Sequence, residues 1–222
     1  VFLYIHRDSV LEDTCKISQE YGVFYYNESE NLNINFLNEE VIDAGGPRRE
    51  YFSLFAERLF NSRFAYIEHE GKTDGLIAAE NSDFIYYKFA PFECIDESNK
   101  LYRINRKFDG PIEIYKVIGA YLANALLQKV NINAKLAPSL IHLMLGKDST
   151  SLSFDDLAAD DPVLHRHLSE ILDPDYDFES ADLSLLSDDT VSVTADNASR
   201  FLYESAQEAM YLRYKNQIDL LV

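Results

Sequence analysis

The chain has 222 residues, of which 47% are hydrophobic and 26% charged, and its formal net charge is −18 at pH 7. This acidic balance, with no basic stripe along the sequence, argues against nucleic acid as a partner. No apolar run approaches the ~18 residues that a membrane-spanning helix needs, so we expect no membrane association. The only cysteines, Cys15 and Cys94, lie far apart in no paired motif, which predicts a reducing location in the cytoplasm or nucleus.

The first forty residues predict two strands and a helix. Residues 1–7 ("VFLYIHR") are rich in aromatic and branched side chains, which is typical of a strand. Ser9 and Glu12 have the spacing of a capping box and predict a helix that begins after Ser9. Residues 31–36 ("NLNINF") alternate apolar side chains with asparagines, as a half-buried strand does.

Residues 39–52 ("EEVIDAGGPRREYF") are best explained as a loop that leads into a helix. Gly45 and Gly46 permit a sharp backbone turn, and Pro47 fits the first helical turn because its missing N–H would have no partner there. The stretch matches neither of the glycine-rich patterns that bind phosphates. We expect Arg48 and Arg49 to pair with carboxylates or carbonyl groups inside the fold.

The middle of the chain predicts a hairpin and a long helix. Residues 63–81 form a strand, a glycine-containing turn and a second strand, whereas the aromatic residues 82–107 fit no regular element. In residues 111–128 the glycine at position 119 indicates a close neighbour. The apolar residues of this helix recur with helical spacing and predict one buried face: Ile114, Val117, Ile118, Tyr121, Leu122, Ala125 and Leu126.

Helices dominate the rest of the sequence. Residues 138–145 and 153–157 predict short helices, and Asp161 with Pro162 predicts the N-terminus of another over 160–172. A short strand at 191–193 is followed by a helical pattern, in two helices, that continues to the last residues. The predicted fold class is α+β, dominated by helices. Because the chain ends within a helical pattern, we expect a piece of a longer protein.

The segment 173–190 is unusually acidic. One interpretation is a solvated, mobile connection, which is the common role of charge runs. The other is a patch that steers a basic partner electrostatically. The first is favoured on the sequence alone, and the second stays open.

No residue pattern predicts a catalytic, metal or cofactor site. His165 and His167 point apart on a helix, and His69 lacks the second histidine of a zinc-protease motif. Cys15 lies on an apolar helix face and Cys94 is flanked by apolar residues, so both are interpreted as small core residues. A cysteine hydrolase that uses Cys94 is kept as an alternative.

Five stretches resemble, in the same order, the HECT family of ubiquitin-protein ligases. The most specific is "DAGGPRREYFSLFAERLFNSRFAYIE" (43–68), which is similar to the family's glycine-containing stretch before a helix. The others are "IHRDSVLEDT" (5–14), "YKVIGAYLANALLQKVNIN" (115–133), "LIHLMLGKDSTSLSFDDLAADDPVLHRHLSEIL" (140–172) and "VTADNASRFLYESAQEAMYLRYKNQIDLL" (193–221). The first stretch, with "FDG" at 108–110, is most similar to the divergent G2/M-phase-specific ligase-like branch.

The resemblance implies the N-terminal lobe of the HECT domain, with a large, mostly helical subdomain over 1–172, small β-hairpins, and a reduced small subdomain with the start of the return helices over 173–222. In this family a conjugating enzyme passes ubiquitin to a cysteine in a C-terminal lobe, which then passes it to a substrate lysine. Neither Cys15 nor Cys94 matches the sequence around that cysteine. We therefore expect residues 1–222 to be inactive alone, without a cofactor, with protein substrates recognised by regions outside them.

The implied role of this lobe is to dock the ubiquitin-conjugating enzyme in an apolar groove. The matching positions are Leu168, Ile171, Leu172, Tyr211, Leu212 and Ile218, which could equally be ordinary core residues. Only residues 173–190 fill a segment that is longer in the family, so a degenerate interaction scaffold without ligase activity is the alternative. A ubiquitin-binding exosite is not carried over, because the aligned positions, His69 and Leu140, are not aromatic.

Overall fold

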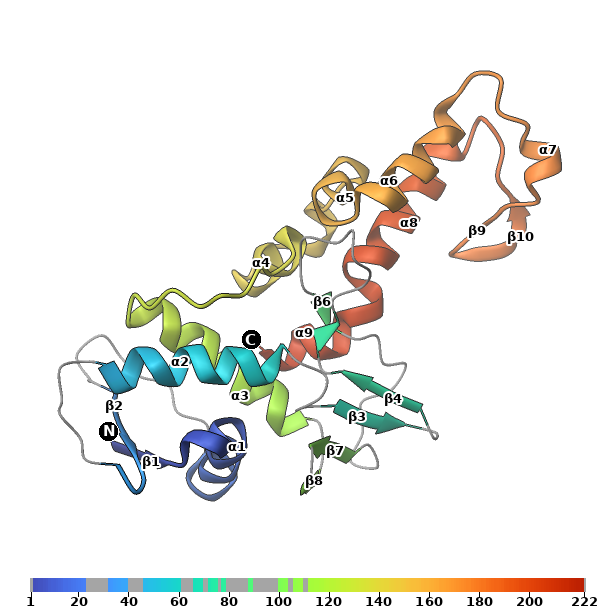
Figure 1. Cartoon of the computed structure of the whole chain (residues 1–222). Coiled ribbons are helices and arrows are strands. Elements are labelled where there is room, and N and C mark those ends of the chain that lie inside the picture. The colour runs from blue at the N-terminus through green and yellow to red at the C-terminus, as the bar shows by residue number, and fades with distance from the viewer. Residues whose placement is uncertain are drawn as a thin grey trace.

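The computed structural model describes residues 2–22, 32–39, 46–60, 66–69, 72–75, 77–78, 88–89, 100–103, 106–109 and 112–221. In this part of the chain the fold is α+β and dominated by helices, as predicted. Figure 1 shows a broad body around the long helix α3 (Ile112–Leu127), from which a narrow line of helices extends to the far end of the molecule.

The two N-terminal strands form a parallel pair. β1 (Phe2–Ile5) lies beside β2 (Asn33–Phe36), and every second residue of both strands is buried because side chains alternate between the faces of a strand. The 3₁₀ helix η1 (Arg7–Ser9) and helix α1 (Val10–Tyr21) follow β1. Both predicted strands and the helix after Ser9 are confirmed.

The predicted capping box at the start of α1 does not form. Ser9 is the N-cap residue, but its side chain accepts no backbone N–H of the helix. Its hydroxyl instead donates to the carboxylate of Asp13 at 3.0 Å, and the same carboxylate accepts the backbone N–H of His6 at 2.8 Å. Asp13 thus links the end of β1 to the first turn of α1, and this link replaces the local cap that Ser9 and Glu12 predicted.

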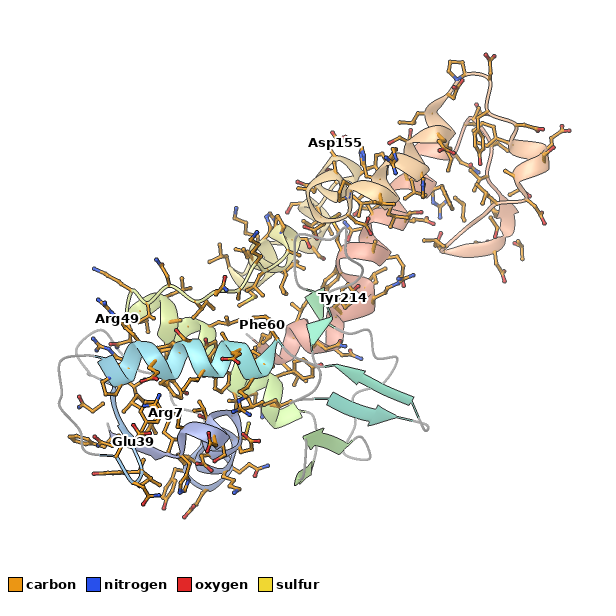
Figure 2. All side chains as sticks on the ribbon, in the orientation of Figure 1. Arg7, Glu39, Arg49, Phe60, Asp155 and Tyr214 are labelled. Atoms are coloured by element: carbon orange, nitrogen blue, oxygen red, sulfur yellow. The ribbon has the colours of Figure 1, made fainter. Side chains whose placement is uncertain are left out.

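The glycine-proline stretch leads into helix α2 (Gly46–Leu59), as predicted. Its inward face buries aromatic rings, including Phe52 and Phe55. Arg48 donates to the side-chain amide oxygen of Gln128 at 2.8 Å. Gln128 directly follows α3, so Arg48 joins the start of α2 to the end of α3. Arg49 is exposed at the start of α2 (Figure 2).

Arg7 joins the end of β1 to the two segments that follow β2. Its Nε and Nη2 atoms donate to the carboxylate of Glu39 at 2.8 and 2.7 Å, and its Nη1 donates to Glu50 of α2. The guanidinium also lies 4.3 Å from the ring centroid of Phe36. Figure 2 shows Arg7 and Glu39 on the same side of the body. These side chains are partly exposed, so the ion pairs add little to the stability that the buried core supplies.

The predicted hairpin at 63–81 is present in the backbone. β3 (Tyr66–His69) and β4 (Lys72–Gly75) are antiparallel and belong to a four-stranded sheet of order β4-β3-β7-β8. The other two strands of this sheet are β7 (Lys100–Arg103) and β8 (Arg106–Asp109). A separate antiparallel pair consists of β5 (Ile77–Ala78) and β6 (Lys88–Phe89). The prediction that 82–107 fits no regular element is wrong where β6, β7 and the start of β8 form, because these segments pair with neighbouring strands. Most of the rest of this stretch, including Cys94, lies outside the described residues.

α3 is the central helix of the body. Its Tyr121 ring stacks on Phe55 with centroids 4.1 Å apart, and the Tyr121 hydroxyl donates to the backbone carbonyl of Phe52 at 2.5 Å. The predicted apolar face is buried from Ile114 to Ala125. Leu126 departs from the prediction, because its side chain is 73% exposed.

Gly119 lies against the last helix, α9 (Lys215–Leu221), which confirms the predicted close neighbour. A Cβ atom on Gly119 would lie 3.1 Å from the carbonyl carbon of Leu221, 3.2 Å from its Cα, and closer still to its carbonyl oxygen. Real Cβ atoms do not approach backbone atoms so closely, so only glycine permits this packing.

A series of short helices leads away from the body (Figure 1). Ser153 and Asp156 form a reciprocal capping box, and Asp161 accepts the backbone N–H of Leu164 at 2.9 Å, so the predicted helix starts are confirmed. The buried Asp160 accepts the backbone N–H of Ser139 at 3.0 Å. The elements are α4 (Pro138–Met144), η2 (Ser149–Ser151), α5 (Phe154–Asp160), α6 (Pro162–Ser169) and η3 (Glu170–Leu172).

The chain turns at the far end and returns along helix α8. The acidic segment contains α7 (Phe178–Ala181) and two antiparallel strands, β9 (Ser184–Leu185) and β10 (Asp188–Ser192). α8 (Ala198–Met210), η4 (Leu212–Tyr214) and α9 then lead back to α3. The predicted return in two helices is confirmed.

Two hydrophobic clusters hold these elements together. The larger contains side chains of α1, α2 and α3 together with residues 206–221. The smaller contains Ile171, Leu185, Val193, Ala198, Phe201 and Leu202. Leu168 packs against both clusters, and α8 contributes to both. The predicted division into 1–172 and 173–222 stays a prediction. The return helices of 173–222 pack on the larger cluster, together with α1, α2 and α3.

Gly119→Ala should lower the free energy of unfolding by about 1–3 kcal/mol, because the added methyl group forces α9 away from α3. The effect opposes the higher helix propensity of alanine, which alone would favour the variant by ~1 kcal/mol. Urea unfolding followed by circular dichroism measures the difference. Gly46→Ala is the matched control, since a Cβ at Gly46 meets nothing within 4 Å. Equal unfolding midpoints for the two variants would contradict the tight contact.

Candidate functional site

The far end of the molecule, residues 170–204, is the candidate site and is called the distal arm here. It contains η3, α7, the β9–β10 pair and the first half of α8. The smaller hydrophobic cluster lies at its centre, and Tyr176, Phe178 and Leu183 pack against that cluster from the acidic segment. The acidic segment therefore has a defined fold with its own apolar core, although most of its charged residues are exposed to solvent, as predicted.

Several large apolar side chains of the distal arm face solvent. Leu172 and Leu186 are each 56% exposed, Tyr203 is 41% exposed and Val191 is 39% exposed. These residues come from η3, the β9–β10 turn, β10 and α8. Clusters of exposed apolar residues with a polar surround are typical of surfaces that bind other proteins. The distal arm can therefore offer apolar contacts while its own core stays closed.

The structure divides the six predicted docking residues. Ile171 and Ile218 are each only 5% exposed, and they belong to different hydrophobic clusters. Their side chains stabilise the fold and are not available to a partner in this conformation. Leu168 and Tyr211 are half-buried, whereas Leu172 and Leu212 are exposed.

The two exposed members of the predicted set lie far apart. Leu172 follows α6, beside the cluster that contains the first turns of α8, and Leu212 follows the last turn of α8. The 13 residues of α8 span about 20 Å at ~1.5 Å per residue. One small groove cannot contain both side chains. Leu186, Val191 and Tyr203, which sequence reasoning missed, lie on the same arm as Leu172; their apolar character was visible in the sequence, but their exposure was not.

The distal arm carries half of the net charge of the chain. Residues 170–204 contain ten acidic residues and one basic residue, Arg200, which gives −9 of the total −18. Exposed charge of one sign raises the local concentration of oppositely charged partners and accelerates their association. The steering interpretation of the acidic segment is thus compatible with its folded state.

Many of these acidic side chains also hold the backbone. Asp177 accepts the backbone N–H of Ser180 at 3.1 Å, and Asp188 accepts the backbone N–H of Thr190 at 3.1 Å and its hydroxyl at 2.6 Å. Hydrogen bonds from Ser180 lower the pKa of Asp177, and those from Thr190 lower the pKa of Asp188. The lowered pKa values mean that the ionised forms stabilise these turns.

A hydrogen-bond network fixes the β9–β10 turn to α8. The Ser187 hydroxyl donates to Glu204 at 2.6 Å, and its backbone N–H donates to the same carboxylate at 3.1 Å. Arg200 donates to Glu204 at 2.8 Å and to the Ser187 hydroxyl at 2.9 Å. The bonds from Ser187 are the main cause of the lowered pKa of Glu204. This network positions Leu186, the neighbour of Ser187, at the edge of the arm.

The other candidate residues do not assemble into a reactive site. Cys15 is buried, and burial raises the pKa of its thiol, which disfavours the thiolate. His165 stacks on Phe154 with ring centroids 4.4 Å apart, while His167 is exposed. Leu140 is buried, so the aligned exosite position offers no surface. The side chain of His69 and the whole of Cys94 lie outside the described residues.

The described part of the chain contains no group of three or more histidine, cysteine, aspartate or glutamate residues that could hold a metal ion. Within that same part, no helix combines the length and the apolar character needed to cross a lipid bilayer. The distal arm thus combines exposed apolar side chains with exposed acidic residues.

Comparisons with known proteins agree on one family. The family model described as "HECT-domain (ubiquitin-transferase)" matches residues 53–222, more than half of the chain. The chain is 23% identical over 172 residues to the Schizosaccharomyces pombe protein named "Probable E3 ubiquitin-protein ligase mug30". This alignment covers 78% of this chain and 18% of that protein.

Two further relatives carry similar names. The chain is 36% identical over 62 residues to the Homo sapiens "Apoptosis-resistant E3 ubiquitin protein ligase 1", covering 28% of this chain and 7% of that protein. It is 26% identical over 180 residues to the Arabidopsis thaliana "E3 ubiquitin-protein ligase UPL2", covering 81% of this chain and 4% of that protein. The chain thus spans less than a fifth of the length of these relatives.

Acidification should loosen the distal arm. The pKa values of Asp177, Asp188 and Glu204 are lowered in the folded state, whereas the same groups titrate near pH ~4 in an unfolded chain. Their stabilising contribution is therefore complete above the unfolded pKa and is lost as the pH falls through the folded values. Hydrogen-exchange protection of the Ser180 and Thr190 amides should fall between about pH 5 and pH 3 and stay constant from about pH 8 to pH 6.

Asp188→Asn is the control for this response, because asparagine keeps a side-chain oxygen for the turn but does not titrate in this range. The variant should lose less protection at Thr190 on acidification than the natural chain does. Protection that is unchanged down to about pH 3 in the natural chain would contradict the stabilising role of these ionised carboxylates.

Proposed function

The chain belongs to the HECT-domain family of ubiquitin transferases, and from this membership we propose that residues 1–222 dock a ubiquitin-conjugating enzyme. The proposed docking surface is the distal arm, with Leu172 as its principal apolar contact. The observation that carries the proposal is the group of exposed apolar side chains on this acidic arm, at the end of the region that the sequence resemblance assigns to conjugating-enzyme binding.

The proposed division of labour follows the family chemistry. A cysteine thiolate in a C-terminal lobe attacks the thioester of the conjugating enzyme, takes over the ubiquitin acyl group and releases the conjugating enzyme's thiol. A substrate lysine then attacks the new thioester. The buried, high-pKa thiol of Cys15 is unsuited to this role, which supports a positioning role for residues 1–222. Ubiquitin and protein substrates are proposed partners of the whole ligase, with substrates bound outside these residues.

The structure supports a smaller set of contact residues than the sequence suggested. Leu172 is retained, with Leu168 at its edge, and Leu186, Val191 and Tyr203 are added from the same arm. Ile171 and Ile218 act from within the core, and they position the arm rather than touch the partner. Leu212 and Tyr211, at the other end of α8, could contact only a partner that extends along that helix.

A degenerate interaction scaffold is the second candidate. The shortness of the segment between Leu172 and Val191 favours it, because the family resemblance implies a longer segment here that forms part of the docking platform. The two candidates differ in one measurable property. A ligase lobe binds ubiquitin-conjugating enzymes, whereas a scaffold that has lost the docking platform does not.

The test is a biolayer or NMR titration of residues 1–222 against a panel of ubiquitin-conjugating enzymes. Micromolar binding is expected for at least one member, and Leu172→Ala should weaken it about tenfold, which corresponds to about 1.4 kcal/mol. Leu126→Ala is the matched control: Leu126 is also exposed but lies on α3, away from the arm, so this change should leave the dissociation constant unaltered.

Raising the salt concentration from about 50 mM to about 500 mM should weaken the same complex, because the proposed steering by the arm is screened. Absence of binding across the panel would favour the scaffold. Binding that Leu126→Ala and Leu172→Ala weaken equally would move the docking surface away from the distal arm. Core variants such as Ile218→Ala are unsuitable, because they test stability before they test contact.

A further inference from the structure

Ser187 lies at the tip of the distal arm and links the β9–β10 turn to α8 (Figure 1). Leu186 and Ser187 connect the two strands, and both side chains are exposed to solvent. The Ser187 hydroxyl has two partners, because it donates to Glu204 at 2.6 Å and accepts from Arg200 at 2.9 Å. A chemical change at this one oxygen therefore alters both contacts at once.

Acidic residues follow Ser187 directly. Asp188 and Asp189 are both exposed, and the whole arm carries −9, from ten acidic residues and one basic residue. A protein kinase with basic residues beside its active site would be attracted by this field and would contact the carboxylates after the target hydroxyl. The neighbouring hydroxyls fit such a kinase less well. Thr190 donates its hydroxyl to Asp188 at 2.6 Å and precedes an apolar residue, while Ser184 precedes two leucines.

The β9–β10 hairpin is short enough to open locally. β9 has two residues, and the pairing of the two strands shifts in register between Asp188 and Ser192. The base of the hairpin is held separately, because the Val193 backbone N–H donates to the carbonyl of Leu183 at 2.8 Å. Leu185 is buried in the smaller cluster. The tip beyond Leu185 can therefore move without disruption of the core of the arm.

From these observations we propose that Ser187 is a phosphorylation site whose modification releases the β9–β10 turn from α8. The donor is ATP bound to a serine kinase that selects acidic residues. The bond between the Ser187 oxygen and the γ-phosphorus forms, the bond from that phosphorus to the β–γ bridging oxygen breaks, and ADP leaves. The hydroxyl proton passes to the catalytic base of the kinase. The product can no longer donate a hydrogen bond from this oxygen to Glu204.

One cation cannot compensate for both anions after this change. Arg200 and Glu204 balance each other in the unmodified arm, with Arg200 Nε donating to Glu204 at 2.8 Å. A phosphoserine adds about −1.5 to −2 of charge at pH 7, beside a carboxylate that already lies at hydrogen-bond distance. Arg200 is the only basic residue of the arm and its side chain is 58% exposed, so solvent weakens its pairing with either anion. Repulsion from Glu204 therefore outweighs the attraction of Arg200.

Release of the turn would act on the apolar surface of the arm. Leu186 is 56% exposed, and its neighbour Ser187 is held to α8 by a backbone N–H that donates to Glu204 at 3.1 Å. Once this bond is lost, the position of Leu186 relative to α8 is no longer fixed. Phosphorylation would thus regulate the docking of a conjugating enzyme. This last consequence rests on the proposed function, whereas the release of the turn does not.

The first experiment asks whether Ser187 accepts the phosphoryl group. Residues 1–222 are incubated with ATP and each of a panel of serine kinases that select acidic residues, and mass spectrometry locates the phosphate. Phosphate on Ser187 is expected, at a rate that falls about tenfold in the double variant Asp188→Asn with Asp189→Asn, because the recognised charges are removed. Absence of phosphate on Ser187, or an unchanged rate in the double variant, overturns the proposed site.

The second experiment measures release of the turn with no partner present. Phosphoserine is encoded at position 187, and NMR follows amide exchange relative to an unfolded peptide with the same modification. Protection of the Ser187 amide should fall about tenfold at pH ~7, while that of Val193, at the base of the hairpin, should stay constant. Ser187→Ala is the matched control, since it removes the hydroxyl contacts without adding charge, and it should lose about threefold or less.

Glu204→Gln tests the cause of the release. Glutamine keeps an oxygen for the Ser187 amide but removes the opposing charge, so phosphoserine in this variant should lower protection by about twofold at most. Unchanged or increased protection in the natural chain overturns the proposal, because Arg200 would then hold the phosphate against α8. An equal loss with and without Glu204→Gln overturns it as well. No conjugating enzyme enters these measurements, so a failed docking titration would leave their outcome unchanged.

Discussion

The close packing of α9 on α3 at Gly119 is the constraint on which the rest of the structure depends. Because no side chain separates the two helices there, the carbonyl group of Leu221 reaches the backbone surface of α3. This contact places residues 206–221 in the larger hydrophobic cluster, although they follow the distal arm in sequence. The contact thereby holds α3, the first helix of residues 112–221, against α9, the last.

Closing the chain at this point also fixes α8, which contributes buried residues to both hydrophobic clusters. Ala198, Phe201 and Leu202 pack in the distal arm, while Ala206, Ala209 and Met210 pack in the body. Between the two sets the buried Gln207 side chain donates to the backbone carbonyls of Ser149 and Leu152 at 2.9 and 2.8 Å. The distal arm, which carries the proposed docking surface, and the body are thus joined by one continuous helix, α8 (Figure 1).

Local signals in the sequence identified the helices well and the exposed apolar surfaces poorly. Asp161 with Pro162, and Ser153 with Asp156, act within one helical turn, so their effect is visible in sequence. The cap expected at Ser9 failed because Asp13, which also binds His6, captured the hydroxyl. The family resemblance marked Ile171 and Ile218 as contact residues, and helical spacing marked Leu126 as buried, but whether an apolar side chain is buried depends on elements distant in sequence. For that reason the first two became core and the third stayed exposed.

Because α8 contributes side chains to both hydrophobic clusters, it fixes the rotation of the distal arm relative to the body. Changes in the loops at the tip of the distal arm can alter the length of the acidic segment without moving the arm relative to the body. One residue added to α8 between Phe201 and Ala206 would instead rotate the tip by about 100° and shift it by ~1.5 Å. The apolar residues of α8 on either side of the insertion would then face different directions and could not pack in both clusters at once. We therefore expect changes in residue number to be tolerated better in the loops of the distal arm than within α8.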